Sequence, residues 1–112
     1  MSTNIFYPPK AVREEAKKGL ALREKAPPSK KAGTRVGLAR ANQLAREDPV
    51  SIETIKRMVS FFARHEGNEE GEDPFDRGRQ AWLLWGGNAG RTWANAILNS
   101  WKKEQESKNG YG

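Results

Sequence analysis

The chain contains no cysteine and only one histidine, His65, among its 112 residues. Without cysteine there is neither a disulfide framework nor a thiolate metal site, and one histidine cannot build a zinc site alone. No apolar run approaches the ~20 residues that a membrane-spanning helix needs. The segment from Met1 to Tyr7 lacks the basic start and apolar stretch of a signal peptide. We therefore expect no metal and no membrane partner, and we expect the protein to act in a cytoplasm.

Motifs that carry catalysis are also scarce. Glu66 follows His65 and could pair with it, but no nucleophile motif and no P-loop is present. The stretch Gly86-Gly87-Asn88-Ala89-Gly90 precedes a predicted helix, so its amides could hold an anion. It lacks the lysine and the preceding strand of a phosphate loop, which favours a tight turn between packed helices. We expect no catalytic residue and no cofactor, and hence a binding function.

Positive charge is what the sequence has in excess. The net charge is +6, and it is unevenly placed. Residues 1–64 contain fourteen Lys/Arg and six Asp/Glu, which gives a net charge of +8. Residues 65–112 contain six Lys/Arg and eight Asp/Glu, which gives a net charge of −2. A positive half attracts polyanions, among which nucleic acid is the commonest in a cell. The simpler alternative is a lysine-rich face that only interacts with water.

Apolar spacing predicts an all-α fold class, with about five helices in a small single-domain bundle. The first helix is expected near residues 10–25, because prolines precede and follow it. The second is expected from about Thr34 to Arg46 and ends before Pro49. No β-strand pattern is visible in the sequence.

Three further helices complete the predicted bundle. Residues 51–65 carry a helical apolar stripe, with Ser51 placed as the N-cap. Residues 68–76 are acidic and poor in apolar side chains, which indicates an exposed loop. A short helix follows at Gln80–Trp85, and the last begins near Asn88. The predicted organisation is an extended arm (1–8), a helical domain (9–103) and a flexible polar tail (104–112).

Large apolar side chains are expected to form the core. The predicted core residues are Ile55, Met58, Phe62, Leu84, Trp85, Trp93 and Ile97. Trp82 and Trp85 share a helix face by their spacing, as do Trp93 and Trp101. Core packing is the favoured role for the tryptophans. Stacking on single-stranded bases would require them to be exposed beside basic residues.

The segment from Leu44 to Arg57 resembles the register of a helix-turn-helix element. Such an element has Leu-Ala late in its first helix, a turn of three to four residues and Val-Ser at the start of its second. Leu44-Ala45 and Val50-Ser51 hold that register. Pro49 departs from it, because glycine is usual there. Simple helix packing, with DNA contact through a basic face, is the alternative.

Several longer stretches resemble a family of small proteins and domains from tailed bacteriophages, including cyanobacterial phages. The resemblance rests on residues 9–20, on Gly33-Thr34-Arg35-Val36-Gly37-Leu38-Ala39-Arg40-Ala41, and on residues 51–66 joined to 81–90. Similar domains occur alone and attached to phage head-maturation proteins. The resemblance implies a phage origin and an all-α domain, and it supplies no catalytic or ligand residue. The chain departs from the family after Glu66, where a longer loop is usual, and at Asn88, where aspartate is frequent.

These observations predict a small basic phage-type DNA-binding protein that is largely sequence-independent, with DNA favoured over RNA. The predicted phosphate contacts are Lys30, Lys31, Arg35, Arg40, Lys56, Arg57 and Arg64. The alternative is a virion assembly or host-protein-binding module with no nucleic-acid role. Its partner surface would be the tryptophan-rich helices and the acidic loop. In either case we expect the protein in the host cytoplasm or in the virion.

Overall fold

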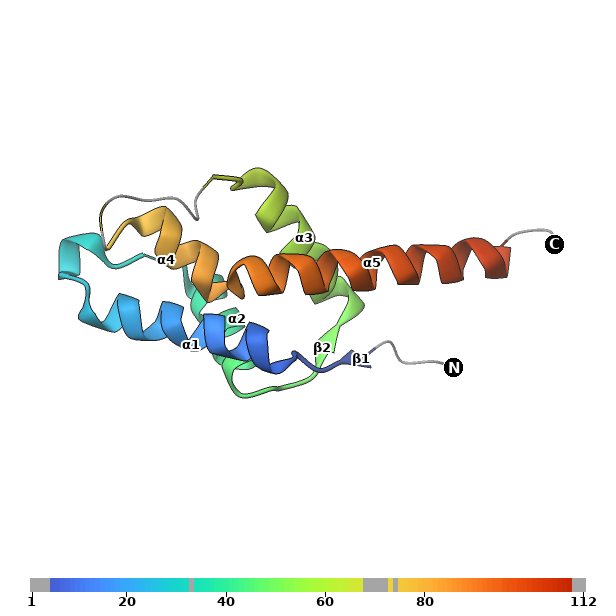
Figure 1. Ribbon diagram of the computed structural model, residues 1–112, viewed down its shortest axis with the longest axis horizontal. Helices are drawn as coiled ribbons and strands as arrows, with labels where there is room; N and C mark the ends of the chain where they lie inside the picture. The colour runs from blue at the N-terminus through green and yellow to red at the C-terminus, as the bar shows by residue number, and fades with distance from the viewer. Residues whose placement is uncertain (1–4, 33, 68–72, 74, 110–112) are drawn as a thin grey trace.

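The computed structural model describes residues 5–32, 34–67, 73 and 75–109. The elements, in chain order, are β1 (Ile5–Phe6), α1 (Lys10–Lys25), the 3-10 helix η1 (Pro28–Lys30), α2 (Arg35–Ala45), β2 (Val50–Ser51), α3 (Ile52–Arg64), α4 (Arg77–Leu84) and α5 (Gly87–Asn109) (Figure 1). The prediction of a small all-α domain with about five helices is confirmed.

A two-stranded antiparallel sheet joins β1 to β2, although the sequence showed no strand pattern. Ile5 pairs with Ser51, and Phe6 pairs with Val50. A strand of two residues is too short to show an alternating pattern, and its partner here is distant in the sequence. The pairing fixes the extended arm beside the start of α3.

Side-chain caps set where three helices begin. Thr34 caps α2, Ser51 caps α3 as predicted, and Asp76 caps α4, each accepting a hydrogen bond from a backbone N–H of the first turn. The Asp76 cap starts α4 at Arg77, earlier than the predicted start at Gln80. Asp76, the last residue of the predicted acidic loop, is thus the N-cap of α4, and Arg77 lies in a first helical turn.

The core lies where α1, α3, α4 and α5 meet. Four of the predicted core residues are buried, namely Ile55, Met58, Phe62 and Leu84. Three others are only partly buried, namely Trp85, Trp93 and Ile97. The fully buried tryptophan is Trp82, whose Nε1 donates a hydrogen bond to Asn88 Oδ1 at 3.0 Å. Core packing is thus the role of Trp82, while the other tryptophans border the surface.

Glycines hold α4 close to its neighbours. A Cβ at Gly19 would lie 2.7 Å from the backbone N of Leu84, so α1 and α4 can approach this closely only with glycine there. Gly86 has φ +110° and makes the predicted tight turn between α4 and α5. A Cβ at Gly87 would lie 2.9 Å from the Glu15 carboxylate, so an acidic side chain already occupies the positive end of α5.

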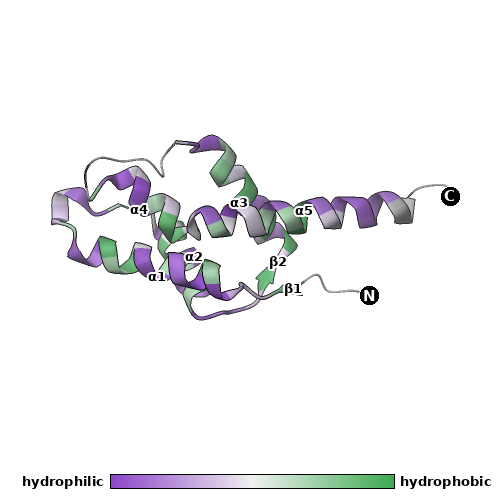
Figure 2. Cartoon of the chain, viewed as in Figure 1, coloured by the Kyte–Doolittle hydropathy of each residue, from purple (hydrophilic) through white to green (hydrophobic). Residues whose placement is uncertain are grey.

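The longest helix, α5, projects beyond the body of the domain (Figure 1). Ala94 and Leu98 in its first half are buried. Its outer turns are mainly hydrophilic (Figure 2), and the molecule measures 56 Å along its longest axis. Residues 104–109, placed by the sequence in a flexible tail, continue the helix. The rest of that tail lies outside the described residues.

The link between α2 and α3 is longer than the turn of a helix-turn-helix element. Residues 46–51 form it, and they include β2. The main packing partners of α2 are α1 and α4 rather than α3. Within the described ranges no helix is long and apolar enough to cross a membrane, and no group of three metal-ligating side chains occurs.

Candidate nucleic-acid interface

The seven basic residues predicted to contact phosphates do not form one continuous surface. Lys30 and Lys31 lie at η1, Arg35 and Arg40 lie on α2, and Lys56, Arg57 and Arg64 lie on α3. The structure engages some of them in contacts within the protein and leaves others directed to solvent. The contacts that each residue already makes determine whether its charge is available to a phosphate.

The two lysines at η1 have partners within the protein. Lys30 Nζ lies 2.7 Å from Asp73 Oδ2, and this hydrogen bond lowers the pKa of the Asp73 carboxyl. Lys31 Nζ donates to the backbone carbonyls of Arg23 at 2.8 Å and Glu24 at 2.9 Å. These carbonyls belong to the last turn of α1, where a positive charge is favourable. Both lysines therefore stabilise the fold locally.

A buried amide holds the η1 region against α4. Gln80 is fully buried, and its Oε1 accepts a hydrogen bond from the Ala32 N–H at 3.0 Å. Its Nε2 donates to the backbone carbonyls of Lys30 and Phe75, both at 2.9 Å. Because one side chain satisfies three backbone groups, the position of the η1 region depends on it.

Lys56 and Arg35 lie apart from the groove between α2, α3 and α4. The ammonium of Lys56 lies 4.3 Å from the centroid of the Trp101 ring, a cation–π contact between α3 and α5. Arg35 is exposed in the first turn of α2. Neither residue lines that groove.

A groove of about 390 Å³ separates the start of α2, the end of α3 and α4; we call it the α2–α3–α4 groove. Its inner wall contains the buried side chains of Phe61 and Leu84. Arg64 and Arg77 line it from α3 and α4, and both are exposed at its rim. Thr34 lines it at the α2 end. The groove therefore combines an apolar interior with a cationic edge.

Three aromatic rings that line this groove stack on one another, and a guanidinium lies over the last of them. The Trp85 and Phe61 rings have centroids 4.7 Å apart and planes 8° apart. The Phe61 and His65 rings have centroids 4.4 Å apart and planes 22° apart. The guanidinium of Arg40 lies 5.6 Å from the Trp85 centroid. The resulting aromatic column (Arg40, Trp85, Phe61 and His65) joins α2, α3 and the end of α4.

Arg40 is partly buried, and its Nη1 donates a hydrogen bond to Gln43 Oε1. Burial lowers the pKa of Arg40, and the positive charge of Arg57 lowers it further. Nε of Arg40 is buried and has no hydrogen-bond partner among the residues that the structure describes. Arg57 and Arg64 are seven residues apart on α3, which places them on the same helix face as Phe61. Arg57 and Arg64 therefore lie one turn to either side of the Phe61 ring on α3.

We call Arg40, Arg57, Arg64 and Arg77 the arginine cluster. Within the described part of the chain, none of the four forms an ion pair with an acidic side chain. Three of them were predicted as phosphate contacts, whereas Arg77 was not. The signal that could have identified Arg77 is Asp76, whose side chain is a good N-cap and would place Arg77 at the start of a helix.

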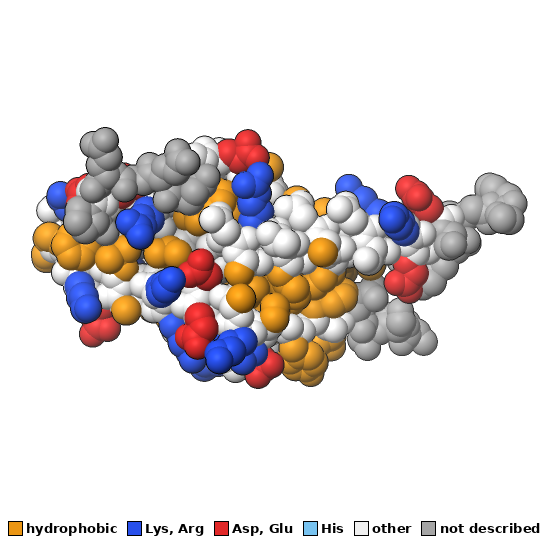
Figure 3. All heavy atoms as spheres, in the orientation of Figure 1, with side chains coloured by type: hydrophobic (Ala, Val, Ile, Leu, Met, Phe, Trp, Pro, Cys, Tyr) orange, Lys and Arg blue, Asp and Glu red, His pale blue; other side chains and the backbone are white. Residues whose placement is uncertain are grey.

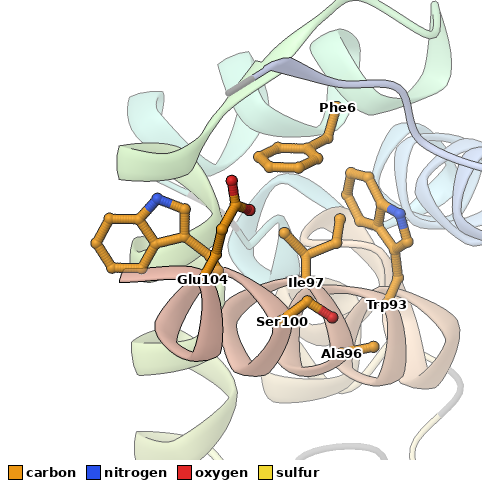
Figure 4. Close-up of a pocket in the computed structure, with 7 residues that line it drawn as sticks. Phe6, Trp93, Ala96, Ile97, Ser100 and Glu104 are labelled. Carbon is orange, nitrogen blue, oxygen red and sulfur yellow. The ribbon is translucent and has the colours of Figure 1, made fainter. Parts of the chain in front are cut away.

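A second concave site is apolar. A pocket of about 230 Å³ lies between β1 and α5, lined by Phe6, Trp93, Ala96, Ile97, Ser100, Trp101 and Glu104. Figure 4 shows Phe6 reaching over Ile97, with Trp93 beside them. Hydrophobic side chains gather between the middle of α5 and the N-terminal strand (Figure 3). Ile5 and Tyr7, which flank Phe6, are 48% and 62% exposed.

Comparison of the chain with known protein families, with curated proteins and with solved structures finds no match. The resemblance to the phage domain family therefore stays a prediction. Function must be inferred from the geometry of the two sites.

Proposed function

We propose that the protein binds DNA through the arginine cluster, without catalysis and largely without sequence preference. The observation that carries this proposal is that Arg64 and Arg77 line one groove, while Arg40 lies over the Trp85 ring of its wall and Arg57 is one turn from Phe61 on α3. The positive charges of Arg40 and Arg57 repel each other, and a bound polyanion relieves that repulsion. Guanidinium groups also match phosphate oxygens with paired N–H donors.

The proposed contacts explain the expected lack of sequence preference. Hydrogen bonds to phosphate oxygens position a protein on DNA but carry no base information. Arg35, exposed in the first turn of α2, can add a contact at the margin of the cluster. Lys30 and Lys31 contribute little in this proposal, because their ammonium groups already have partners.

A helix-turn-helix mode is the weaker form of the proposal. It requires the first turn of α3 to enter the major groove, where the exposed Glu53 would face the bases. Phosphates repel a carboxylate, and the long link 46–51 departs from the compact turn of such elements. Contact through the arginine cluster avoids both difficulties. The phage origin, with action in the host cytoplasm or the virion, remains part of the proposal.

A salt titration tests DNA binding. Labelled duplex and single-stranded oligonucleotides would be titrated with protein at several salt concentrations, and affinity measured by fluorescence anisotropy. Four phosphate contacts predict a slope of about −3.6 for log affinity against log salt on a duplex. Absence of binding at ~50 mM salt, or an affinity independent of salt, would contradict the proposal.

The apolar pocket favours a second candidate function. A pocket lined by Phe6, Trp93 and Ile97 suits an apolar side chain of a phage or host protein. This is the assembly or host-protein-binding alternative, and failure of every DNA titration would make it the preferred one. The acidic loop predicted as part of that partner surface lies largely outside the described residues.

A further inference from the structure

We infer that the α2–α3–α4 groove binds one nucleotide of a single-stranded nucleic acid, with its base on the His65 ring and its phosphate on Arg64 and Arg77. This inference rests on the proposed function and narrows it to unpaired strands. It depends on three features of the groove: the order of the aromatic column, the placement of the rim arginines and the size of the cavity.

Within the described residues the aromatic column ends at His65, which lines the groove. Trp85 and His65 both stack on Phe61, and because one ring face holds one stacked partner, they occupy its opposite faces. Arg40 lies over the Trp85 ring at the other end of the column. His65 is half-buried, and within the described residues it stacks only on Phe61. A nucleobase stacked on the outer face of His65 would continue the column.

The phosphate of the same nucleotide would lie between the two rim arginines. Arg64 precedes His65 on α3, and Arg77 lines the groove from α4. Neither forms an ion pair with an acidic side chain in the described part of the chain. Thr34 lines the same groove, and its hydroxyl oxygen already accepts the Gly37 N–H, which leaves its O–H free to donate.

The dimensions of the groove select for an unpaired nucleotide. A volume of about 390 Å³ lies within the range of small-ligand sites. A base inside a duplex is stacked on its neighbours and is inaccessible to His65, whereas an unpaired base presents a free face. The arginine cluster alone would contact both duplex and single-stranded DNA. Stacking of a base on His65 is possible only for the single strand.

His65 provides its own reporter, because it is the only histidine in the chain. Its imidazole proton signals would be followed by NMR during titration with a deoxyadenosine strand of about 12 nucleotides, with the matching duplex and with inorganic phosphate. A base stacked on the ring should shift both carbon-bound proton signals upfield through its ring current. The duplex and phosphate alone should cause no such upfield shift.

Substitutions identify the contacts. His65→Ala should lower the ratio of single-strand to duplex affinity by about 5- to 150-fold, the range for loss of one stacked base. His65→Phe keeps a ring and should restore most of that ratio, which separates stacking from a folding defect. Arg64→Gln with Arg77→Gln should weaken single-strand binding, whereas Lys17→Gln, on the exposed face of α1, should not.

The outcomes separate this inference from the proposed function. Single-strand binding seen by anisotropy without a His65 shift would overturn the inference and leave the proposed function standing. An equal upfield shift with the duplex would also overturn the inference. Absence of binding to either form of DNA would overturn both.

Discussion

Two basic regions of the molecule contrast in how their charges are used. At η1, Lys30 forms an ion pair with Asp73, and Lys31 binds carbonyl groups at the end of α1. In the arginine cluster, Arg40 and Arg57 have no acidic partner in the described part of the chain. The lysines of the first region bind acceptor groups of the protein itself, whereas the second region, in the proposed function, contacts DNA.

The contrast shows that a count of basic residues does not locate a binding surface. The two lysines at η1 and the four residues of the arginine cluster all carry the same formal charge. The free energy that each can contribute to binding DNA depends on the contacts that it already makes within the protein. A lysine with a partner must give up that partner before it binds a phosphate. We therefore expect substitutions at η1 to lower the stability of the fold and leave DNA affinity unchanged. Substitutions in the arginine cluster should lower DNA affinity and leave stability nearly unchanged.

The largest expected effect is the loss of Gln80. Gln80→Leu leaves the buried Ala32 N–H without its partner, which costs about 1–3 kcal/mol, and it also removes the partner of the part-buried carbonyls of Lys30 and Phe75. Urea unfolding should show a loss of about 2–3 kcal/mol. DNA affinity, measured where the variant is folded, should be unchanged. A variant that unfolds like the parent but binds DNA poorly would reverse the roles assigned to the two regions.

Arg40 should show the opposite pattern. Arg40→Met keeps an unbranched side chain against Trp85 and removes both the repulsion from Arg57 and a buried unpaired Nε. Stability should change by no more than about 1 kcal/mol, because these two gains offset the lost cation–π contact and the lost hydrogen bond to Gln43. Affinity for DNA should fall about tenfold at ~0.1 M salt, the loss of one phosphate contact. A large loss of stability with unchanged affinity would make Arg40 a structural residue.

The smallest expected effect concerns Asp73. Its pKa is lowered mainly by the hydrogen bond from Lys30 and also by the Phe75 N–H. Lys30→Gln should therefore raise the pKa of Asp73 toward its ordinary value, leaving the part due to Phe75. A carboxyl with a lowered pKa stabilises the fold above its unfolded pKa, and this stabilisation is lost as pH falls through the folded pKa. Carbon-13 NMR titration of Asp73 measures the change, and an unaltered pKa would show that the ion pair is absent in solution.

Much of the fold could be predicted because its signals are local. Prolines bracket α1, and Ser51 caps α3 ahead of an apolar stripe. The β1–β2 pairing could not be predicted, because it joins residues distant in the chain through backbone groups alone. The early start of α4 was missed because Asp76 was interpreted as part of an acidic loop rather than as a cap.

The candidate site was predictable only in part. Arg40, Arg57 and Arg64 follow from their place in the basic half and on predicted helices. Their proximity to Arg77 depends on packing between helices, which charge patterning does not show. The partner of Lys30 lies beyond α3, in the segment predicted as an exposed acidic loop, so its ion pair could not be predicted from neighbouring residues.

The most direct test of the central claim compares two double variants that remove the same charge. Arg57→Gln with Arg64→Gln should reduce the steepness of the salt dependence on duplex DNA by about 1.8, since two phosphate contacts are lost. Lys30→Gln with Lys31→Gln should leave the slope nearly unchanged. Equal reductions in both variants would contradict the account, because net charge rather than the placement of the arginines would then determine binding.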